Sequence, residues 1–435
     1  MKATRRSNAR LTKQAFMTQA GTSASTAIDI KRLGLDSGAH LLLKRALAEL
    51  PPGGRLCVRG SAPDLAVHLR GWCRAQGHEF IQSEAESISD EAEPEGRSPV
   101  VAWVVRGPVT GGRLSGAEAA GGTDPRESGA VVERPPARWG LAARGAVVEA
   151  GGPEFYFRLD SKTEVWAESV PRLYQQAAAA QWNPATAIDW DTPFELSLEV
   201  ESAVVQVMTY LIENETAALL IPAKFLAQVH PHFREVMQLL AIQVADEARH
   251  IEVFTRRATL RRKETLGLST VGGQQSLKTL FDEPDFTLAS FLLSVLGEGT
   301  FLNLLWFLER HAPDPVTRQV ARLAAQDESR HVAFGMGHLQ YAISLDPGLR
   351  GRLASAAVQR HDALAQTAGL NEEVFDALIL LAAGGWEPDA ISSGFERVQN
   401  LKGEMAADRT SRLVKLGFEP GEAKTLSELH TQNFM

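Results

Sequence analysis

A five-residue pattern that occurs twice constrains the fold of this chain more than any other feature. The copies span residues 246–250 (DEARH) and 327–331 (DESRH). In each copy a Glu and a His stand three residues apart, so on a helix they project from one face and can bind the same metal ion or adjacent ones. A lone Glu-x-x-His pattern arises by chance about once in a chain of this composition. The alternative, two solvated salt-bridge faces, does not explain why the full string occurs twice. The predicted ligands on these helices are Glu247, His250, Glu328 and His331.

A site for two metal ions in a helical bundle needs one further carboxylate from each of two other helices. Glu298 lies in an otherwise apolar run, FLLSVLGEGTFLNLLWFL, which spans residues 291–308. A lone carboxylate on the core face of such a helix costs several kcal/mol unless a cation compensates its charge. We therefore predict that Glu298 is a metal ligand.

The equivalent ligand on the first helix is either Glu213 or Glu215. On a helix, Glu215 shares its face with apolar residues, whereas Glu213 shares its face with polar ones. Glu215 also precedes Glu247 by 32 residues, close to the 30 residues that separate the corresponding pair in the second half. Glu215 is the predicted ligand and Glu213 is the alternative.

The composition limits the function classes that are open to the chain. Its 435 residues include 45 basic and 53 acidic ones, which gives a formal net charge of −8 and disfavours a nucleic-acid scaffold. The only cysteines, Cys57 and Cys73, exclude a disulfide framework and a site of three or four thiolates. We find no run of about 20 apolar residues and no secretory signal. The chain is expected to be cytoplasmic and not to span a membrane.

The character of the sequence changes along the chain, and five segments are expected. A flexible tail is followed by a small α+β domain, a Gly/Pro/Arg-rich linker, an all-α four-helix bundle and a C-terminal helical extension. The predicted boundaries are 1–27, 28–110, 111–160, 161–345 and 346–435.

Helix-start signals place the helices of the bundle and of the extension. Thr192-Pro193-Phe194-Glu195 has the form of a capping box, and Asp314-Pro315 has a capping residue before proline. Pro222 should kink or end the first helix. The predicted helices are 193–227, 232–262, 286–310, 315–343, 348–367, 371–383 and 388–416, with a polar crossover at 263–285.

The first hundred residues show short elements of mixed type. The expected order is β-α-β-α-β-β, with helices over residues 36–50 and 64–76. Strands are expected over residues 55–59, 77–81 and 100–106, after a first strand near residue 28. The acidic segment 83–98 is expected to be a loop.

Together, these ligands make residues 190–345 resemble the ferritin-like di-iron carboxylate superfamily, and within it the oxygenase and monooxygenase hydroxylases. The resemblance implies two iron ions, or manganese in their place, within about 4 Å of each other and bridged by carboxylates. It further implies that Asp246 and Asp327 accept the free ring N–H groups of the histidines and that Arg249 and Arg330 pair with these aspartates. The six residues in the expected order are Glu215, Glu247, His250, Glu298, Glu328 and His331.

Two differences from related families limit which branch of the superfamily the chain resembles. Ribonucleotide reductase small subunits carry a tyrosine four residues after the first metal histidine, where this chain has Phe254. Arylamine N-oxygenases add a histidine at the position of Ala324. Neither the activity of the reductases nor that of the N-oxygenases is therefore assigned to this chain directly. We interpret His338 as a packed or capping histidine rather than an extra ligand, and Tyr210 and Tyr341 as packing residues.

Residues 28–106 more weakly resemble the TusA-like sulfur-carrier proteins. That family carries its sulfur on a Cys-Pro-x-Pro element at the start of the first helix, where this chain has Asp36-Ser37-Gly38-Ala39. Sulfur transfer is therefore not expected. Cys57 and Cys73 are interpreted as packing residues, and the domain is expected to serve docking or substrate presentation.

The function that these features favour is that of an O2-dependent di-iron oxygenase or oxidase. Its expected partners are a small organic substrate and an electron donor, and a homodimer is possible. The pocket beside the metals is expected to be lined by Ala218, Phe301 and Leu302. The alternative is iron handling or peroxide scavenging, as in ferritins and rubrerythrins, although no cysteine pairs are present for a rubredoxin-type electron site. The metal framework alone does not identify the substrate.

Overall fold

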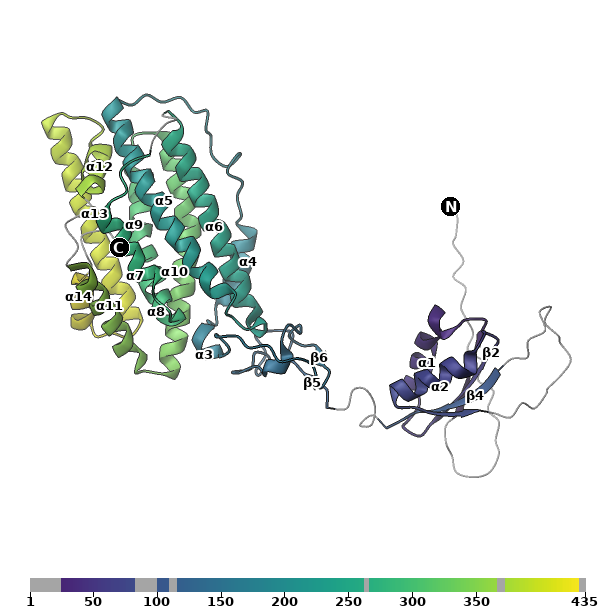
Figure 1. The fold of residues 1–435 in the computed structure, drawn as a ribbon. Helices are drawn as coiled ribbons and strands as arrows, with labels where there is room; N and C mark the ends of the chain where they lie inside the picture. Colours follow the sequence, from purple (N-terminus) through teal and green to yellow (C-terminus); the bar gives the residue numbers. More distant parts are fainter. Residues whose placement is uncertain (1–24, 83–99, 109–115, 262–265, 366–371, 430–435) are drawn as a thin grey trace. The chain divides into compact units, whose positions relative to one another are not determined.

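The computed structural model describes residues 25–82, 100–108, 116–261, 266–365 and 372–429. The predicted tail and the acidic segment 83–98 fall almost entirely outside them. The chain divides into two compact units (Figure 1). The N-terminal unit comprises the chain up to Ala119 together with Val147–Gly152, and the helical body comprises Ala120–Ala146 and the chain from Pro153 onward.

The N-terminal unit has the predicted β-α-β-α-β-β order. Four of its strands form one sheet in the order β1-β2-β4-β3, with β1 and β2 parallel and the other neighbours antiparallel. Apolar side chains of both helices, such as Leu43 and Leu69, pack with Leu56 and Val58 of β2 in one core. The elements are β1 (Ser25–Lys31), the 3-10 helix η1 (Leu35–Ser37), α1 (Ala39–Ala48), β2 (Arg55–Gly60), α2 (Leu65–Gln76), β3 (Glu79–Gln82) and β4 (Val100–Val105).

The segment predicted as a linker contains little regular structure, but much of it packs on the helical body. It includes β5 (Glu118–Ala119), the 3-10 helix η2 (Ala137–Trp139) and β6 (Val147–Val148). Arg144 is buried and forms a bidentate ion pair with Glu235, with distances of 2.6 and 2.7 Å. A buried, fully paired guanidinium fixes this stretch far better than its Gly/Pro-rich composition suggests.

Four long helical segments form the core of the helical body, and these are the segments predicted to carry the ligands. Helices α5 and α6 pack together, α9 packs on α10, and α6 packs on α10. Together with the extension described below, this confirms the predicted fold class. The elements are α3 (Lys162–Val165), α4 (Val170–Ala179), α5 (Leu198–Leu226), η3 (Pro231–Phe233), α6 (Arg234–Thr259), α7 (Val271–Phe281), α8 (Phe286–Ser290), η4 (Phe291–Glu298), α9 (Gly299–His311) and α10 (Pro315–Leu345).

The helix starts agree with the sequence in one case and differ in another. Asp314 caps α10 as predicted, accepting the backbone N–H of Thr317 at 2.8 Å. The capping box at residues 192–195 does not start α5, whose N-cap is Ser197. Phe194 instead lies under the guanidinium of Arg261, which is 4.4 Å from the centroid of the Phe194 ring. This cation–π contact favours a position of the stretch outside the helix.

Two further expectations concern this part of the chain. Pro222 is expected to kink or end the first helix, and it does not end it, because α5 continues to Leu226. The predicted polar crossover contains α7, which starts at the cap Thr270 and packs on α5. Helices α3 and α4, which precede the bundle, are not among the predicted helices.

The third bundle segment is not a regular α-helix. Between α8 and α9 the chain forms a π-helix, η4, which ends at Glu298. The backbone N–H of Gly299 donates to the carbonyl of Ser294, five residues earlier. A π-turn inserts an extra residue into the helical ladder and is frequent at functional sites. Here it sets the direction in which Glu298 leaves the helix.

Two helical stretches are long and apolar enough to cross a membrane by length and composition alone. They are Leu198–Leu226 and Phe286–His311, in which 67% and 78% of the most apolar window is buried inside the protein. Both are inner helices of the bundle, and packing in the core accounts for their apolar character.

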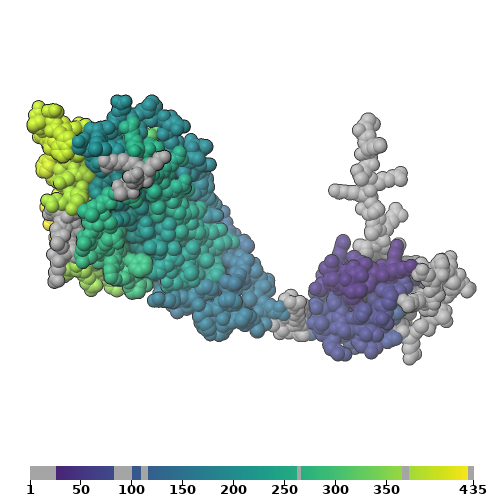
Figure 2. Space-filling model, turned by 45° about the horizontal axis from the view of Figure 1, so that its top comes forward, coloured from purple at the N-terminus to yellow at the C-terminus, as the bar shows by residue number. Residues whose placement is uncertain are grey.

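The C-terminal extension lies along one side of the bundle and is coloured yellow in Figure 1 and Figure 2. Helix α12 packs on α5, and α13 packs on α9 and on η4. The predicted helix start at Asn371 lies outside the described residues. The elements are α11 (Leu349–Ala365), α12 (Glu372–Ala383), α13 (Pro388–Lys415) and α14 (Pro420–Glu428).

Candidate metal centre

Six buried side chains converge in the centre of the bundle, and each of its four helical segments contributes to them. Their ligand atoms form two groups, and within each group all the atoms lie within 4.8 Å of one another. Both groups include Glu247 and Glu328. Glu215 of α5 and His250 of α6 complete the first group, and Glu298 of η4 and His331 of α10 complete the second.

The two histidines present the same ring atom to the cluster. His250 Nδ1 lies 3.1 Å from Glu247 Oε2 and 3.4 Å from Glu215 Oε2. His331 Nδ1 lies 3.0 Å from Glu247 Oε1 and 3.3 Å from Glu328 Oε2. Because Nδ1 of each ring faces the carboxylates, Nε2 points away from the centre.

Each outward ring nitrogen meets an aspartate from the opposite pentapeptide. His250 Nε2 lies 3.2 Å from Asp327 Oδ2, and His331 Nε2 lies 3.2 Å from Asp246 Oδ2. With these carboxylates as acceptors, Nε2 carries the proton and Nδ1 is left free to bind a metal ion. The sequence predicted aspartate partners for the histidines but did not say which aspartate faces which histidine.

A polar layer surrounds the two aspartates. Arg249 pairs with Asp246 and, at 2.9 Å, with Asp327, and Arg330 pairs with Asp327. The sequence predicted that both arginines pair with these aspartates. The aspartates and arginines therefore form one network that connects the two pentapeptides.

Two members of this network had no signal in the sequence, Gln181 and Trp182, which follow α4. The side-chain amide of Gln181 donates to Asp246 Oδ1 at 2.8 Å and its carbonyl accepts from Arg249 at 2.7 Å. The indole N–H of Trp182 donates to Asp327 Oδ2 at 2.7 Å. Only the fold brings this segment against the pentapeptides, so spacing could not reveal it.

A third unpredicted residue, Gln243, could have been found from the sequence. Its amide donates to Glu298 Oε1 at 3.0 Å, and its side chain is buried on α6. Gln243 precedes Glu247 by one helical turn, so it shares the face of the ligands. The signal in the sequence is a polar residue one helical turn before a predicted ligand, on the face of the helix that points into the core.

The other candidate residues lie outside the cluster. Glu213 is half-buried and belongs to neither ligand group, whereas Glu215 is 2% exposed within the first group. His338 contacts the carbonyl of Trp166 at 3.0 Å, and burial lowers its pKa to about 4. Tyr210 packs against Phe301 with ring centroids 5.8 Å apart. Tyr341 is half-buried, with the ammonium of Lys162 5.4 Å from its ring centroid.

The charges of the cluster show why it fits metal ions. Burial and the neighbouring Glu247 raise the pKa of Glu215 well above its usual value, and burial and Glu328 do the same to the pKa of Glu298. Among the described residues, Glu215 Oε1 and Glu298 Oε2 have no hydrogen-bond partner although they are buried. Two divalent cations would balance the negative charge of the four carboxylates and would give these two buried oxygens a partner. The residues therefore fit a pair of metal ions.

The pKa values of the two histidines are raised, although burial alone would lower them. Burial disfavours protonated His250 and His331, but the surrounding carboxylates outweigh it and raise both pKa values well above the usual value of 6.5. Likewise, burial opposes ionisation of Glu247, but His331 and the hydrogen bonds around it hold its pKa well below the usual value of 4.5. Without metal, the surrounding carboxylates therefore favour the protonated form of both histidines.

These shifts predict how the stability of the metal-free protein depends on pH. The raised pKa values of Glu215 and Glu298 reduce stability above pH 4.5, where the unfolded carboxyls ionise. The stability that the raised histidine pKa values contribute is present in full below pH 6.5. It is lost as the pH rises through the histidine pKa values of the folded protein. We expect the thermal unfolding midpoint of chelator-treated protein to fall from about pH 6 to pH 9, and that of metal-loaded protein to change much less. Equal slopes for the two forms would contradict this expectation.

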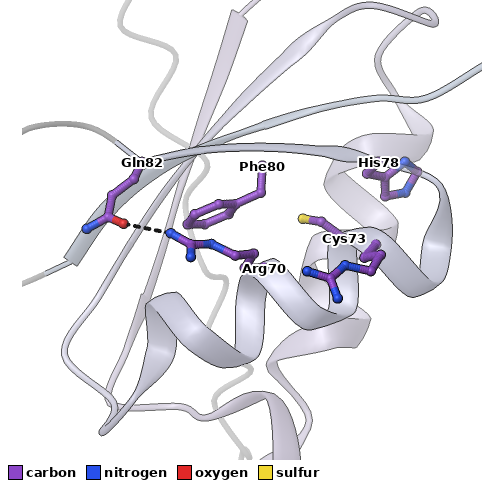
Figure 3. A pocket seen from close by; sticks show the side chains of 6 residues that line it. Arg70, Cys73, His78, Phe80 and Gln82 are labelled. Atoms are coloured by element: carbon purple, nitrogen blue, oxygen red, sulfur yellow. Dashed lines mark hydrogen bonds between the residues drawn. The ribbon is translucent and has the colours of Figure 1, made fainter.

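The N-terminal unit contains a separate surface pocket with a volume of about 370 Å³ (Figure 3). The Arg70 guanidinium lies over the Phe80 ring and donates to Gln82 at 3.1 Å. Cys73 is fully buried at the base, and burial raises its pKa to about 12, so its thiol is protonated at neutral pH. This environment agrees with the interpretation of Cys73 as a packing residue.

No protein family's sequence model matches the chain, and no curated protein matches it. Solved structures similar to it include an R2-like ligand-binding oxidase with an aerobically reconstituted metal cofactor, at 18% identity and a TM-score of 0.40, covering 62% of this chain and 95% of that one. Another is a variant of such an oxidase with an anaerobically reconstituted Mn/Fe cofactor, at 19% identity and a TM-score of 0.42, covering 57% and 94%. By its own helices, the helical body is the predicted ferritin-like four-helix bundle, and six carboxylate and histidine side chains converge in its core.

Proposed function

We propose that the protein is an O2-dependent oxidase or oxygenase that uses a pair of iron ions, or one manganese and one iron, to oxidise a small organic substrate. The observation that carries the proposal is the pair of overlapping ligand groups with four carboxylates and two histidines in the core. Hard carboxylate oxygens with one imidazole for each ion suit iron and manganese. Bound there, the two ions would supply the electrons that reduction of O2 requires.

The protein's own residues contribute position, charge and exclusion of water. Glu247 and Glu328 belong to both ligand groups and would therefore contribute to the binding of both ions. Asp246 and Asp327 keep each histidine in the tautomer that binds metal. Phe254 packs beside His250, with ring centroids 6.2 Å apart, and occupies the position where related reductases carry a tyrosine.

The substrate is expected to bind on the apolar side of the centre. Ala218 and Phe301 are buried, and Leu302 is half-buried. Apolar walls around a metal centre favour an uncharged organic group and keep water away from a reactive intermediate. That Ala218, Phe301 and Leu302 line the substrate pocket stays a prediction, and the cofactor would set the chemistry.

Oxygen uptake tests the proposal. Protein loaded anaerobically with Fe(II) and mixed with O2 and excess reductant should consume O2 over many turnovers while holding two irons per chain. Glu247→Ala protein should consume O2 no faster than free Fe(II). The iron-handling alternative predicts the opposite pattern, in which iron accumulates beyond two ions per chain and O2 uptake stops when added Fe(II) is exhausted. That pattern would overturn the oxidase proposal.

A further inference from the structure

One side chain of the C-terminal extension, Arg412 of α13, forms a hydrogen bond with the π-helix. Its Nε donates to the backbone carbonyl of Val295 at 2.9 Å. Val295 lies three residues before Glu298, inside the wide turn where the ladder changes from π to α. In such a turn the carbonyl groups lose the regular alignment of an α-helix and can accept from outside donors. Arg412 supplies such a donor at this junction.

The residue after the ligand, Gly299, makes room for this guanidinium. A Cβ atom at position 299 would lie 2.5 Å from Arg412 Nε and 2.6 Å from Arg412 Cζ. Gly299 has φ −61° and ψ −31°, ordinary helical values that alanine adopts easily. The requirement for glycine here is therefore one of space for Arg412 and not one of backbone conformation.

The position of Arg412 is costly for a charged side chain. Among the described residues, its buried Nη2 atom has no hydrogen-bond partner. Burial lowers its pKa to about 10, and Asp408, one turn earlier, partly opposes this effect. Purely structural packing against α9 would be served by an apolar side chain, which needs no partner. A guanidinium is needed only if the donor to the π-helix matters.

We propose that Arg412 is a positioning residue for the metal centre. By holding the carbonyl of Val295 and filling the space at Gly299, it fixes the junction between η4 and α9 and thereby the direction of the Glu298 carboxylate. Gln243 contacts the same carboxylate directly, through Glu298 Oε1 at 3.0 Å. This inference rests on the two-metal centre of the proposed function, but it concerns metal binding and not the reaction.

Cobalt(II) binding to the full chain tests the inference, because it reports metal affinity whether or not the protein is an oxidase. Arg412→Ala and Gly299→Ala should each weaken binding of one of the two Co2+ ions about tenfold and change its visible absorption, and Arg412→Lys should restore part of the affinity. In the double variant the collision at position 299 is gone, so its affinity should equal that of Arg412→Ala alone.

Asn303→Ala is the matched control, because Asn303 joins α9 to α13 through Asp408 at 2.8 Å and lies outside η4. It should bind Co2+ like the unaltered protein. Wild-type binding and absorption in Gly299→Ala, with its helical content unchanged by circular dichroism, would overturn the inference even if Arg412→Ala failed to fold. Additive losses in the double variant, or an equal loss in Asn303→Ala, would also overturn it. A protein that binds two Co2+ with these dependences but consumes no O2 when loaded with iron would refute the proposed function and leave the inference standing.

Discussion

Alanine at Glu247 or Glu328 should reduce the protein from two bound metal ions to none. Each of these carboxylates belongs to both ligand groups, so its loss removes a ligand from both ions at once. It also removes one of the negative charges that make the buried cluster favourable for cations. Elemental analysis after loading with Fe(II) or Co2+ and desalting measures the number of ions retained per chain.

The other two carboxylates give a graded comparison in the same assay. Glu215 belongs only to the first group and Glu298 only to the second, so alanine at either position should leave one ion bound. Glu213→Ala changes a neighbouring acid outside both groups and should retain two. Two ions in Glu247→Ala, or none in Glu213→Ala, would show that the ligand set is wrong.

Replacing Arg257 with methionine should lower the free energy of unfolding by about 3–5 kcal/mol, because it leaves two buried carboxylates unpaired. The guanidinium is fully buried on α6, 2.7 Å from Glu201 Oε1 of α5 and 2.8 Å from Asp314 Oδ2 before α10. It also donates to the Thr317 hydroxyl at 2.7 Å. Urea denaturation followed by circular dichroism measures the loss.

The adjacent Arg256 provides the matched control for this substitution. Its guanidinium is exposed and lies 4.1 Å from the ring centroid of Trp190. Such exposed contacts contribute about 0.5–1 kcal/mol, so Arg256→Met should cost far less than Arg257→Met. If the two variants unfold at the same urea concentration, the buried pairs of Arg257 do not hold the three helices together.

The sequence predicted those parts of the molecule that depend on local periodicity. The repeated pentapeptide predicted two helices with ligands on one face, and the apolar run around Glu298 predicted a third core helix. The β-α-β-α-β-β order of the N-terminal unit also followed from short alternating stretches separated by turn residues. Its resemblance to sulfur carriers stays a prediction.

The parts that could not be predicted depend on contacts between distant segments. The crossing of the aspartate–histidine pairs is set by how α6 packs against α10, and no spacing within either pentapeptide encodes it. Arg144 turns a linker-like composition into a packed segment by pairing with Glu235 across 91 residues of sequence. The π-turn before Glu298 has no periodic signature, because a single inserted residue disturbs an apolar run that is buried on every side.

The crossed aspartate–histidine pairs have a consequence for the order of events during synthesis of the chain. His250 is separated from Asp327 by 77 residues, and His331 from Asp246 by 85. At about 5–20 residues per second, the first pentapeptide leaves the ribosome several seconds before the aspartate that orients its histidine. A nascent chain that ends before α10 has neither ligand group complete. The centre therefore acquires its affinity for metal only when the bundle closes, which keeps a redox-active ion away from an unfinished protein.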